Sequence, residues 1–204
     1  MMMPALPGIL MRALSLDPPA RAAEVGTAAL IERLRQGESR ALGEAYDEHH
    51  EAVRAFAGRL VGDSAAAEDL VHEVFVTLPR AIRRFQAQSS LRSFLIGIAI
   101  QHARHHVRSA SRRRAALARL AAEPERSASS PEASVTDRRL LEAIARALDE
   151  LPLDQRVAFV LCDVEERSSV EAAELVSAPE ATLRTRLFHA RKKLRAALER
   201  AGLT

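Results

Sequence analysis

Apolar residues recur at helical spacing in the second part of residues 166–198, near the end of the chain. They are spaced four, three, four and three residues apart, and so form one stripe: Leu183, Leu187, Ala190, Leu194, Ala197 and Leu198. Four basic residues lie off this stripe on the open side of the helix: Arg184, Arg191, Lys192 and Arg195. The pattern predicts a helix with a core-facing side and a cationic side. Pro179 stands just before it, where a missing backbone N–H costs little.

A shorter predicted helix, residues 168–176, precedes this one across a tight turn. Its first residue, Ser168, is followed three positions later by Glu171, which is the pattern of a capping box. Two helices joined by a tight turn, the second one basic, are typical of a helix-turn-helix, whose second helix enters the DNA major groove. An ordinary helical hairpin with a solvated basic face gives the same pattern, so this stretch alone leaves both interpretations open.

The same periodicity predicts four helices upstream, over residues 27–37, 39–61, 64–85 and 91–114. Gly37 and Gly62 close the first two helices, and Asp63 or Ser64 caps the third. Pro79 lies inside the third pattern, and it should kink that helix or end its first half.

The fold class follows from composition and from breaks in the pattern. Ala, Leu, Arg and Glu dominate, and no run alternates with period two, so we predict an all-α protein. Residues 119–136, rich in Ser, Pro, Ala and Glu, predict a flexible linker, and residues 1–26 predict a disordered leader with Gly26 among its breakers. We therefore expect two small helical domains, at 27–118 and 137–204, the second containing the helix-turn-helix.

Charge is distributed unevenly along the chain. No Asp or Glu occurs from Val74 to Ala122, whereas the same span holds ten arginines. Such a block repels itself unless it meets a polyanion, and nucleic acid is the usual partner. A solvated helical face normally mixes both signs of charge, and a membrane surface is less favoured than nucleic acid. The block therefore supports the DNA-binding interpretation of the C-terminal helices.

Other chemistries find little support in the sequence. Cys162 is the only cysteine, which excludes an internal disulfide and a cysteine-based zinc site, and we expect it to be a small core residue. His102 and His106 share a helical face but lie among arginines with no carboxylate in the surrounding block, so we expect no metal and no other cofactor. We expect no signal peptide and no transmembrane segment, and therefore a cytoplasmic protein.

Three sets of residues resemble the extracytoplasmic-function sigma factors of bacterial RNA polymerase. Residues 67–75 read AEDLVHEVF, close to the family's A-E-D-L-V-Q-E-V-F, and residues 83–101 read RRFQAQSSLRSFLIGIAIQ, like the segment that follows it. The third set, LPLDQRVAFVLCDVEERS and APEATLRTRLFHARKKL at 151–168 and 178–194, resembles the family's fourth region. The resemblance implies an all-α sigma factor with region 2 at 27–118 and region 4 at 137–204.

The resemblance also implies a role for individual residues. Core polymerase would be bound by Asp69, His72 and Glu73. The opened −10 element would be bound by Gln86, Gln88, Ser89, Arg92, Gln101, Arg104, Arg108, Arg112 and Arg113. The duplex −35 element would be bound by Thr182, Arg184, Thr185, Arg186, Phe188, His189, Arg191 and Lys192, of which Arg186, Arg191 and Lys192 either anchor phosphates or support the helix. The expected partners are core RNA polymerase, promoter DNA and an anti-sigma factor. We expect the chain to be a monomer and not to bind a membrane.

The chain departs from the family pattern at several positions, among them His72, Pro79, Phe94, Gly97 and Ser177. Ser177 stands where the family has a turn glycine, so a residue with a Cβ must adopt a positive φ.

Two other functions compete with a sigma factor. A stand-alone helix-turn-helix regulator would normally dimerise on two half-sites, but the chain shows no heptad seam for a dimer. An enzyme would use Asp69 and Glu73 as an acid–base pair, but nothing nearby supplies a nucleophile or a phosphate-binding loop.

Overall fold

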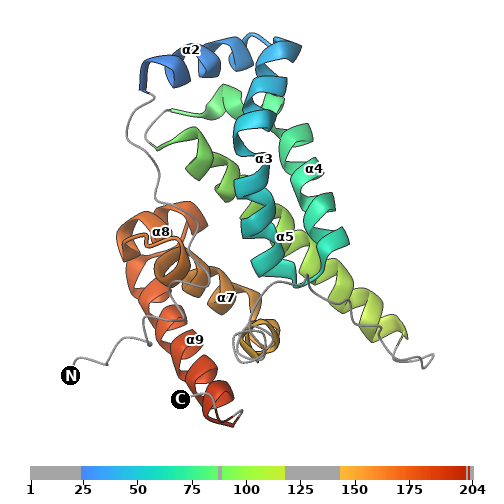
Figure 1. Ribbon diagram of the computed structural model, residues 1–204, viewed down its shortest axis with the longest axis vertical. Coiled ribbons are helices and arrows are strands. Elements are labelled where there is room, and N and C mark those ends of the chain that lie inside the picture. The colour runs from blue at the N-terminus through green and yellow to red at the C-terminus, as the bar shows by residue number, and fades with distance from the viewer. Residues whose placement is uncertain (1–23, 87–88, 118–142, 201, 203–204) are drawn as a thin grey trace. The chain divides into compact units, whose positions relative to one another are not determined.

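The computed structural model describes residues 24–86, 89–117, 143–200 and 202, and for residues 24–26 and 108–117 it describes the backbone alone. In these ranges every regular element is a helix, as predicted (Figure 1). The chain divides into two compact units, one holding the described helices before residue 131 and the other holding those after it. The leader, linker and domain limits predicted from the sequence fall largely outside the described residues and stay predictions.

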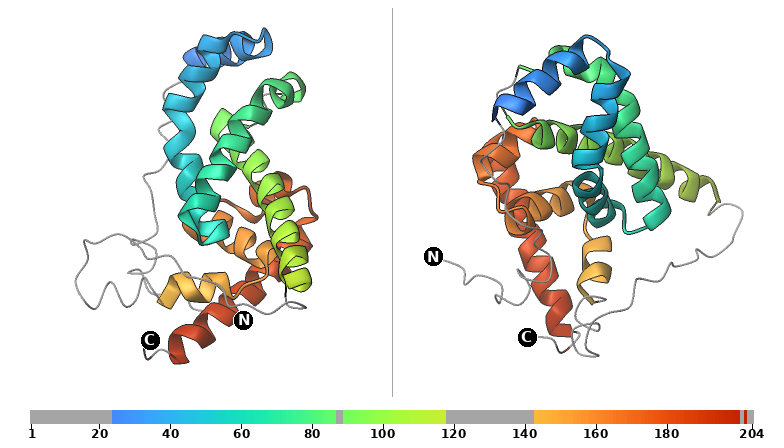
Figure 2. Two further views of the ribbon diagram at one scale, coloured as in Figure 1. Left: turned by 90° about the vertical axis from the view of Figure 1, so that its right-hand side faces the viewer. Right: turned by 45° about the horizontal axis from the view of Figure 1, so that its top comes forward.

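The first unit contains α2 (Glu24–Arg35), α3 (Ser39–Val61), α4 (Ser64–Ala81), the 3₁₀ turn η1 (Ile82–Arg84) and α5 (Leu91–Leu117). Helices α3, α4 and α5 pack against one another, and α2 lies against α3 and η1 (Figures 1 and 2). The side chains that fill the centre are Phe56, Leu60, Leu70, Leu78, Ile82, Leu95, Ile96 and Ile100. Apart from Phe56, these side chains are aliphatic, as is to be expected of a chain with no Trp and one Tyr.

Local signals set the junctions between these helices. Gly62 ends α3 with a φ of 68°, and its N–H donates to the Gly58 carbonyl at 3.0 Å. The Asp63 carboxylate then caps α4 by accepting from the backbone N–H groups of Ala65 and Ala66. The predicted stop at Gly62 and the predicted cap at Asp63 are both confirmed.

Two predicted breaks do not occur. Helix α2 begins at Glu24, so Gly26 lies inside it. The glycine does not break the helix, because one glycine lowers helix stability by only about 1 kcal/mol. Helix α4 does not end at Pro79 but continues to Ala81. Leu78 and Ile82, on either side of the proline, are fully buried. We attribute the continuation to this packing, which offsets the hydrogen bond that proline cannot donate.

The second unit holds a helical segment at residues 143–149, α7 (Leu153–Phe159), the π-helical turn η2 (Val160–Val164), α8 (Ser169–Val176) and α9 (Glu180–Arg200). Helix α7 packs along α9, and α8 packs against α9 as well. Five residues of the predicted stripe on α9 are buried, and Ala197 is half-buried. Cys162, expected in the core, is only half-buried, and desolvation raises the pKa of its thiol to about 11.

Helix α8 begins and ends as the sequence predicts. The Ser168 hydroxyl accepts from the Glu171 N–H, and the Glu171 carboxylate accepts from the Ser168 N–H at 2.9 Å, which completes the capping box. Ser177 ends the helix with a φ of 52°. Its N–H donates to the Glu174 carbonyl at 3.1 Å, and the Ala178 N–H donates to the Ala173 carbonyl at 3.0 Å. This pair of bonds is the Schellman motif, which normally places glycine where Ser177 stands.

We expect Ser177→Gly to raise the free energy of unfolding by about 1 kcal/mol, because glycine adopts the left-handed conformation without the steric penalty of a Cβ. Ser177→Ala is the matched control, since it keeps the Cβ and should bring no gain. Urea unfolding of the full chain followed by circular dichroism measures both variants. Equal stability of the glycine and alanine variants would contradict the assignment of strain to this position.

Candidate nucleic-acid interface

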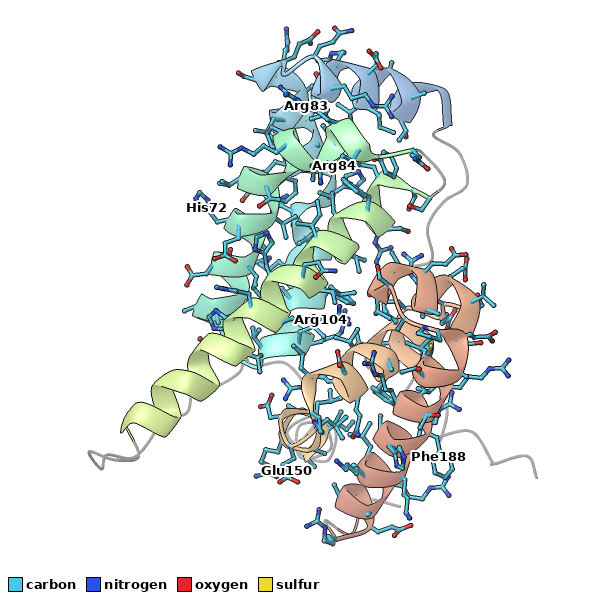
Figure 3. All side chains as sticks on the ribbon, turned by 180° about the vertical axis from the view of Figure 1, so that it is seen from behind. His72, Arg83, Arg84, Arg104, Glu150 and Phe188 are labelled. Atoms are coloured by element: carbon cyan, nitrogen blue, oxygen red, sulfur yellow. The ribbon has the colours of Figure 1, made fainter. Side chains whose placement is uncertain are left out.

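Helix α9 presents an exposed face opposite its buried stripe. Thr182, Arg184, Thr185, Phe188, His189 and Lys192 are all exposed, as expected for residues that contact DNA. Phe188 is 47% exposed, and its ring lies edge-on to the His189 ring at a centroid distance of 5.5 Å (Figure 3). This face joins an apolar centre to polar and charged neighbours.

The start of α9 is tied to α8 through Glu180. The Ser169 hydroxyl donates to Glu180 Oε1 at 2.7 Å, and Arg184 Nη2 lies 2.9 Å from the same oxygen. These contacts fix the turn between the two helices, while the Arg184 side chain stays 69% exposed. The Arg184 guanidinium is therefore paired with Glu180 and still open to an approaching ligand.

Two other arginines of α9 are paired within the protein. Arg186 Nη2 lies 2.9 Å from Asp154 Oδ2 of α7. Arg191 Nε donates to Asp163 Oδ2 at 2.9 Å, and its Nη2 donates to the other carboxylate oxygen. The hydrogen bonds to Asp163 raise the pKa of the Arg191 guanidinium above its ordinary value. Of the two roles that the sequence left open for these arginines, the geometry favours support of the helix.

In the first unit, the loop before α5 is fixed at both ends. Phe85 and Phe94 flank the loop, and their ring centroids lie 4.6 Å apart. Arg35 of α2 donates to the Phe85 carbonyl. The Ser90 hydroxyl accepts from the Ser93 N–H at 3.1 Å and so caps α5. The sequence analysis missed the role of Arg35, because no local pattern links residues 50 positions apart.

The residues expected to bind the −10 element lie in two places: Gln86, Gln88, Ser89 and Arg92 in or next to this loop, and the others along α5. Gln86, Ser89 and Gln101 are exposed, and Arg92 and Arg104 are half-buried. Figure 3 shows Arg83 and Arg84 in η1, and Arg104 on α5. Gln88 lies outside the described residues, as do the side chains of Arg108, Arg112 and Arg113. The described residues thus place polar side chains on either side of residues 87–88, at the start of a helix that carries cations.

Helix α4 presents a separate face of mixed chemistry. Asp69, His72 and Glu73, expected to bind polymerase, are exposed on it, and Figure 3 shows His72 projecting from the helix. Val76 lies on the same face one turn after His72 and is 62% exposed. Val76 was not among the residues predicted for this face. Its spacing of three residues from Glu73 and four from His72 indicates that it lies on the same side of the helix.

Glu73 also contacts α5. Its Oε2 lies 3.1 Å from His102 Nδ1, and His102 Nε2 lies 3.0 Å from the Thr77 hydroxyl. The block in sequence contains no carboxylate, but Glu73 lies just outside it and reaches His102 in space. In the part of the chain that is described, no group of three or more His, Cys, Asp or Glu side chains is placed to hold a metal ion.

Comparison with known proteins gives consistent matches on both units. Residues 45–113 match the family model of Sigma-70 region 2, and residues 141–194 match that of Sigma-70, region 4. The RNA polymerase sigma-H factor of Pseudomonas aeruginosa is 27% identical over 178 residues, which cover 83% of this chain and 92% of that protein. The ECF RNA polymerase sigma-E factor of Escherichia coli K12 is 27% identical over 173 residues, covering 81% and 90%.

Two solved structures share the fold. The sigma factor RpoE in complex with the anti-sigma factor NepR from Bartonella quintana is 24% identical, with a TM-score of 0.64 over 77% of this chain and 96% of that one. CnrH in complex with the cytosolic domain of CnrY is 22% identical, with a TM-score of 0.61 over 85% and 97%. Among the described helices, none is both long and apolar enough to cross a membrane.

The neighbours Arg191 and Lys192 should respond differently to substitution. Arg191→Ala leaves the carboxylate of Asp163, a buried residue, without its ion-pair partner, and we expect the free energy of unfolding to fall by about 2 kcal/mol. The cost is below that of a fully buried pair because the Arg191 side chain is 46% exposed.

Lys192→Ala should leave stability unchanged and reduce the slope of log DNA affinity against log salt by about 0.9, which is the loss of one phosphate contact. Urea unfolding and salt titration of binding to promoter duplex measure the two effects. If Arg191→Ala instead reduced the slope of log DNA affinity against log salt and left stability unchanged, Arg191 would be a phosphate contact and not a support of the helix.

Proposed function

The chain belongs to the sigma-70 family of RNA polymerase sigma factors, in its extracytoplasmic-function group, and we propose how its two helical units share the work. Such a factor directs promoter-specific initiation of transcription. The observation that carries the proposal is that matches to region 2 and region 4 occur in one chain, in family order, with one on each helical unit. Each unit then needs its own surface for polymerase or DNA.

The exposed face of α4 is the proposed docking site for core polymerase. Asp69, His72 and Glu73 supply charge and hydrogen bonds, and Val76 supplies an apolar centre. Protein interfaces place apolar groups at the centre and polar groups at the rim, and this face follows that pattern. His102 holds Glu73 from the α5 side, which fixes the carboxylate before polymerase arrives.

The fixed loop and α5 are the proposed site for the opened −10 strand. Gln86, Gln88 and Ser89 offer hydrogen bonds to unpaired bases, and Gln101 adds a further amide from α5. The cations that follow the backbone of the strand are Arg92, Arg104, Arg108, Arg112 and Arg113. A polar loop beside a cationic helix suits single-stranded DNA, whose bases are accessible and whose phosphates need neutralising.

The exposed face of α9 is the proposed reader of the −35 duplex. Thr182, Arg184, Thr185, Phe188 and His189 face the base edges, and Lys192 contacts phosphate. Arg186 and Arg191 hold the helix in place through Asp154 and Asp163. A helix-turn-helix delivers its second helix to the major groove in this way.

The remaining features of the proposal follow from this division. Residues 119–136 tether domains 27–118 and 137–204, so that binding of one DNA reader raises the effective concentration of the other. The chain acts as a cytoplasmic monomer on core polymerase, without catalytic activity of its own, and an anti-sigma factor holds it in the resting cell. The alternative of a stand-alone regulator is not favoured, because it gives the region 2 match no role.

Transcription with purified core polymerase on a genomic fragment library tests the proposal directly. We expect discrete start sites, each preceded by shared −10 and −35 sequences, and no discrete starts when either the chain or the polymerase is omitted. A stable homodimer that binds duplex palindromes, and that directs no initiation with polymerase, would refute it.

The docking face is tested by two neighbouring acids of α4. Asp69→Ala should weaken binding to core polymerase by about tenfold, because it removes a charged side chain from the exposed face that is proposed to contact polymerase. Glu68→Ala is the matched control: Glu68 is also exposed, but it lies toward α3, where it pairs with Arg54 at 3.4 Å. Its affinity should stay within about twofold of the parent. Equal losses for both variants, measured by titration of labelled chain with core polymerase, would remove this face from the interface.

A further inference from the structure

The centre of the exposed face of α9 is apolar, although charges surround it. Ala181, Thr185 and Phe188 follow one another at spacings of four and three residues, and all three are exposed. Arg184 lies on one side of this line, and His189 lies on the other. They lie in the first half of α9 (Glu180–Arg200), which is the part that a recognition helix inserts deepest into the major groove.

Thr185 contributes its methyl group more than its hydroxyl. The hydroxyl donates to the Ala181 carbonyl at 2.9 Å, one turn back along the helix. Its proton is therefore committed within the protein, so toward a partner in the groove the side chain offers its methyl group and an oxygen that can only accept. The methyl group is the apolar part of this pair.

Phe188 extends the same apolar surface by one turn. It is one of four exposed large hydrophobic residues in the described part of the chain, with Tyr46, Val76 and Val170. Among these, Phe188 is the one that lies on α9. A phenyl ring carries no hydrogen-bond donor or acceptor, so it cannot select a guanine, cytosine or adenine by a polar edge.

We propose that α9 recognises the −35 element partly through the methyl groups of thymines, bound by Thr185 and Phe188. This inference rests on the proposed −35 function and names the chemistry that the site reads. The C5 methyl of thymine is the apolar group that a standard base pair presents in the major groove, and Thr methyl and Phe side chains are apolar contacts for it. Arg184 and His189 then read polar edges on either side.

The test replaces thymine with deoxyuracil, which removes this methyl and keeps every hydrogen-bonding group. Each thymine of the −35 duplex, on both strands, is replaced singly in a promoter that the full chain uses with core polymerase. We expect binding to weaken by about fourfold at one or two positions, the value for one buried methyl group. Phe188→Ala should lose this sensitivity at the thymine nearest its ring. Val170→Ala, which removes an exposed apolar group from α8, should keep it.

Two substitutions of Thr185 separate the methyl from the hydroxyl. Thr185→Val keeps a methyl group and loses the hydroxyl, so sensitivity to deoxyuracil should persist. Thr185→Ser keeps the hydroxyl and loses the methyl, so sensitivity at its thymine should disappear. Thermal unfolding checks that both variants fold like the parent.

The outcomes distinguish this inference from the proposed function. Sequence-specific −35 binding that ignores every deoxyuracil substitution overturns thymine-methyl recognition and leaves the sigma-factor assignment intact. The reverse behaviour of the two Thr185 variants also overturns it. If transcription does not depend on the −35 sequence at all, both the proposed function of α9 and this inference are refuted.

Discussion

The bond between Arg191 and Asp163 determines how α9 presents its exposed face. Asp163 is buried in the π-helical turn η2, and Arg191 reaches it with two nitrogens from the side of α9. A bidentate pair of this kind fixes orientation as well as distance, so it limits rotation of α9 about its own axis. The buried stripe sets which side faces the core, and the ion pair sets the angle at which Thr185 and Phe188 face outward. Everything proposed for base reading depends on that angle.

The same pair shows that counting the cations of a helix overestimates how many of them can bind DNA. Arg186 and Arg191 were both among the residues expected to bind the −35 element, yet carboxylates of the same unit pair with both. Arg156 is a more complete case: it is buried and binds Asp149 through a side-chain oxygen and the backbone carbonyl. Charges that are neutralised within the fold release few counterions on binding DNA. The salt dependence of binding should therefore reflect residues such as Lys192 and not the total.

Features controlled by neighbouring residues could be predicted from the sequence, whereas features controlled by distant ones could not. The capping box at Ser168, the stop at Gly62 and the positive φ at Ser177 depend on neighbouring residues, and each was predicted correctly. The passage of α4 through Pro79 depends on tertiary packing, and the partner of Arg191 lies 28 residues away. Both kinds of feature apply to the proposed site residues. Helical periodicity predicts which of them are exposed, but it does not reveal which of them are paired with distant residues of the same protein.

His102 connects the two proposed functions of the first unit. It stands on α5 next to Gln101, proposed to bind the opened strand, and it contacts Glu73 and Thr77 of α4, whose exposed face is proposed to bind polymerase. These contacts join α4 and α5 directly, without passing through a loop. Docking of polymerase would then restrain the helix that holds the strand, and the loop fixed by Arg35 and Ser90 would be restrained with it. Rigidity between the two surfaces, more than the strength of either one alone, is what this arrangement of side chains provides.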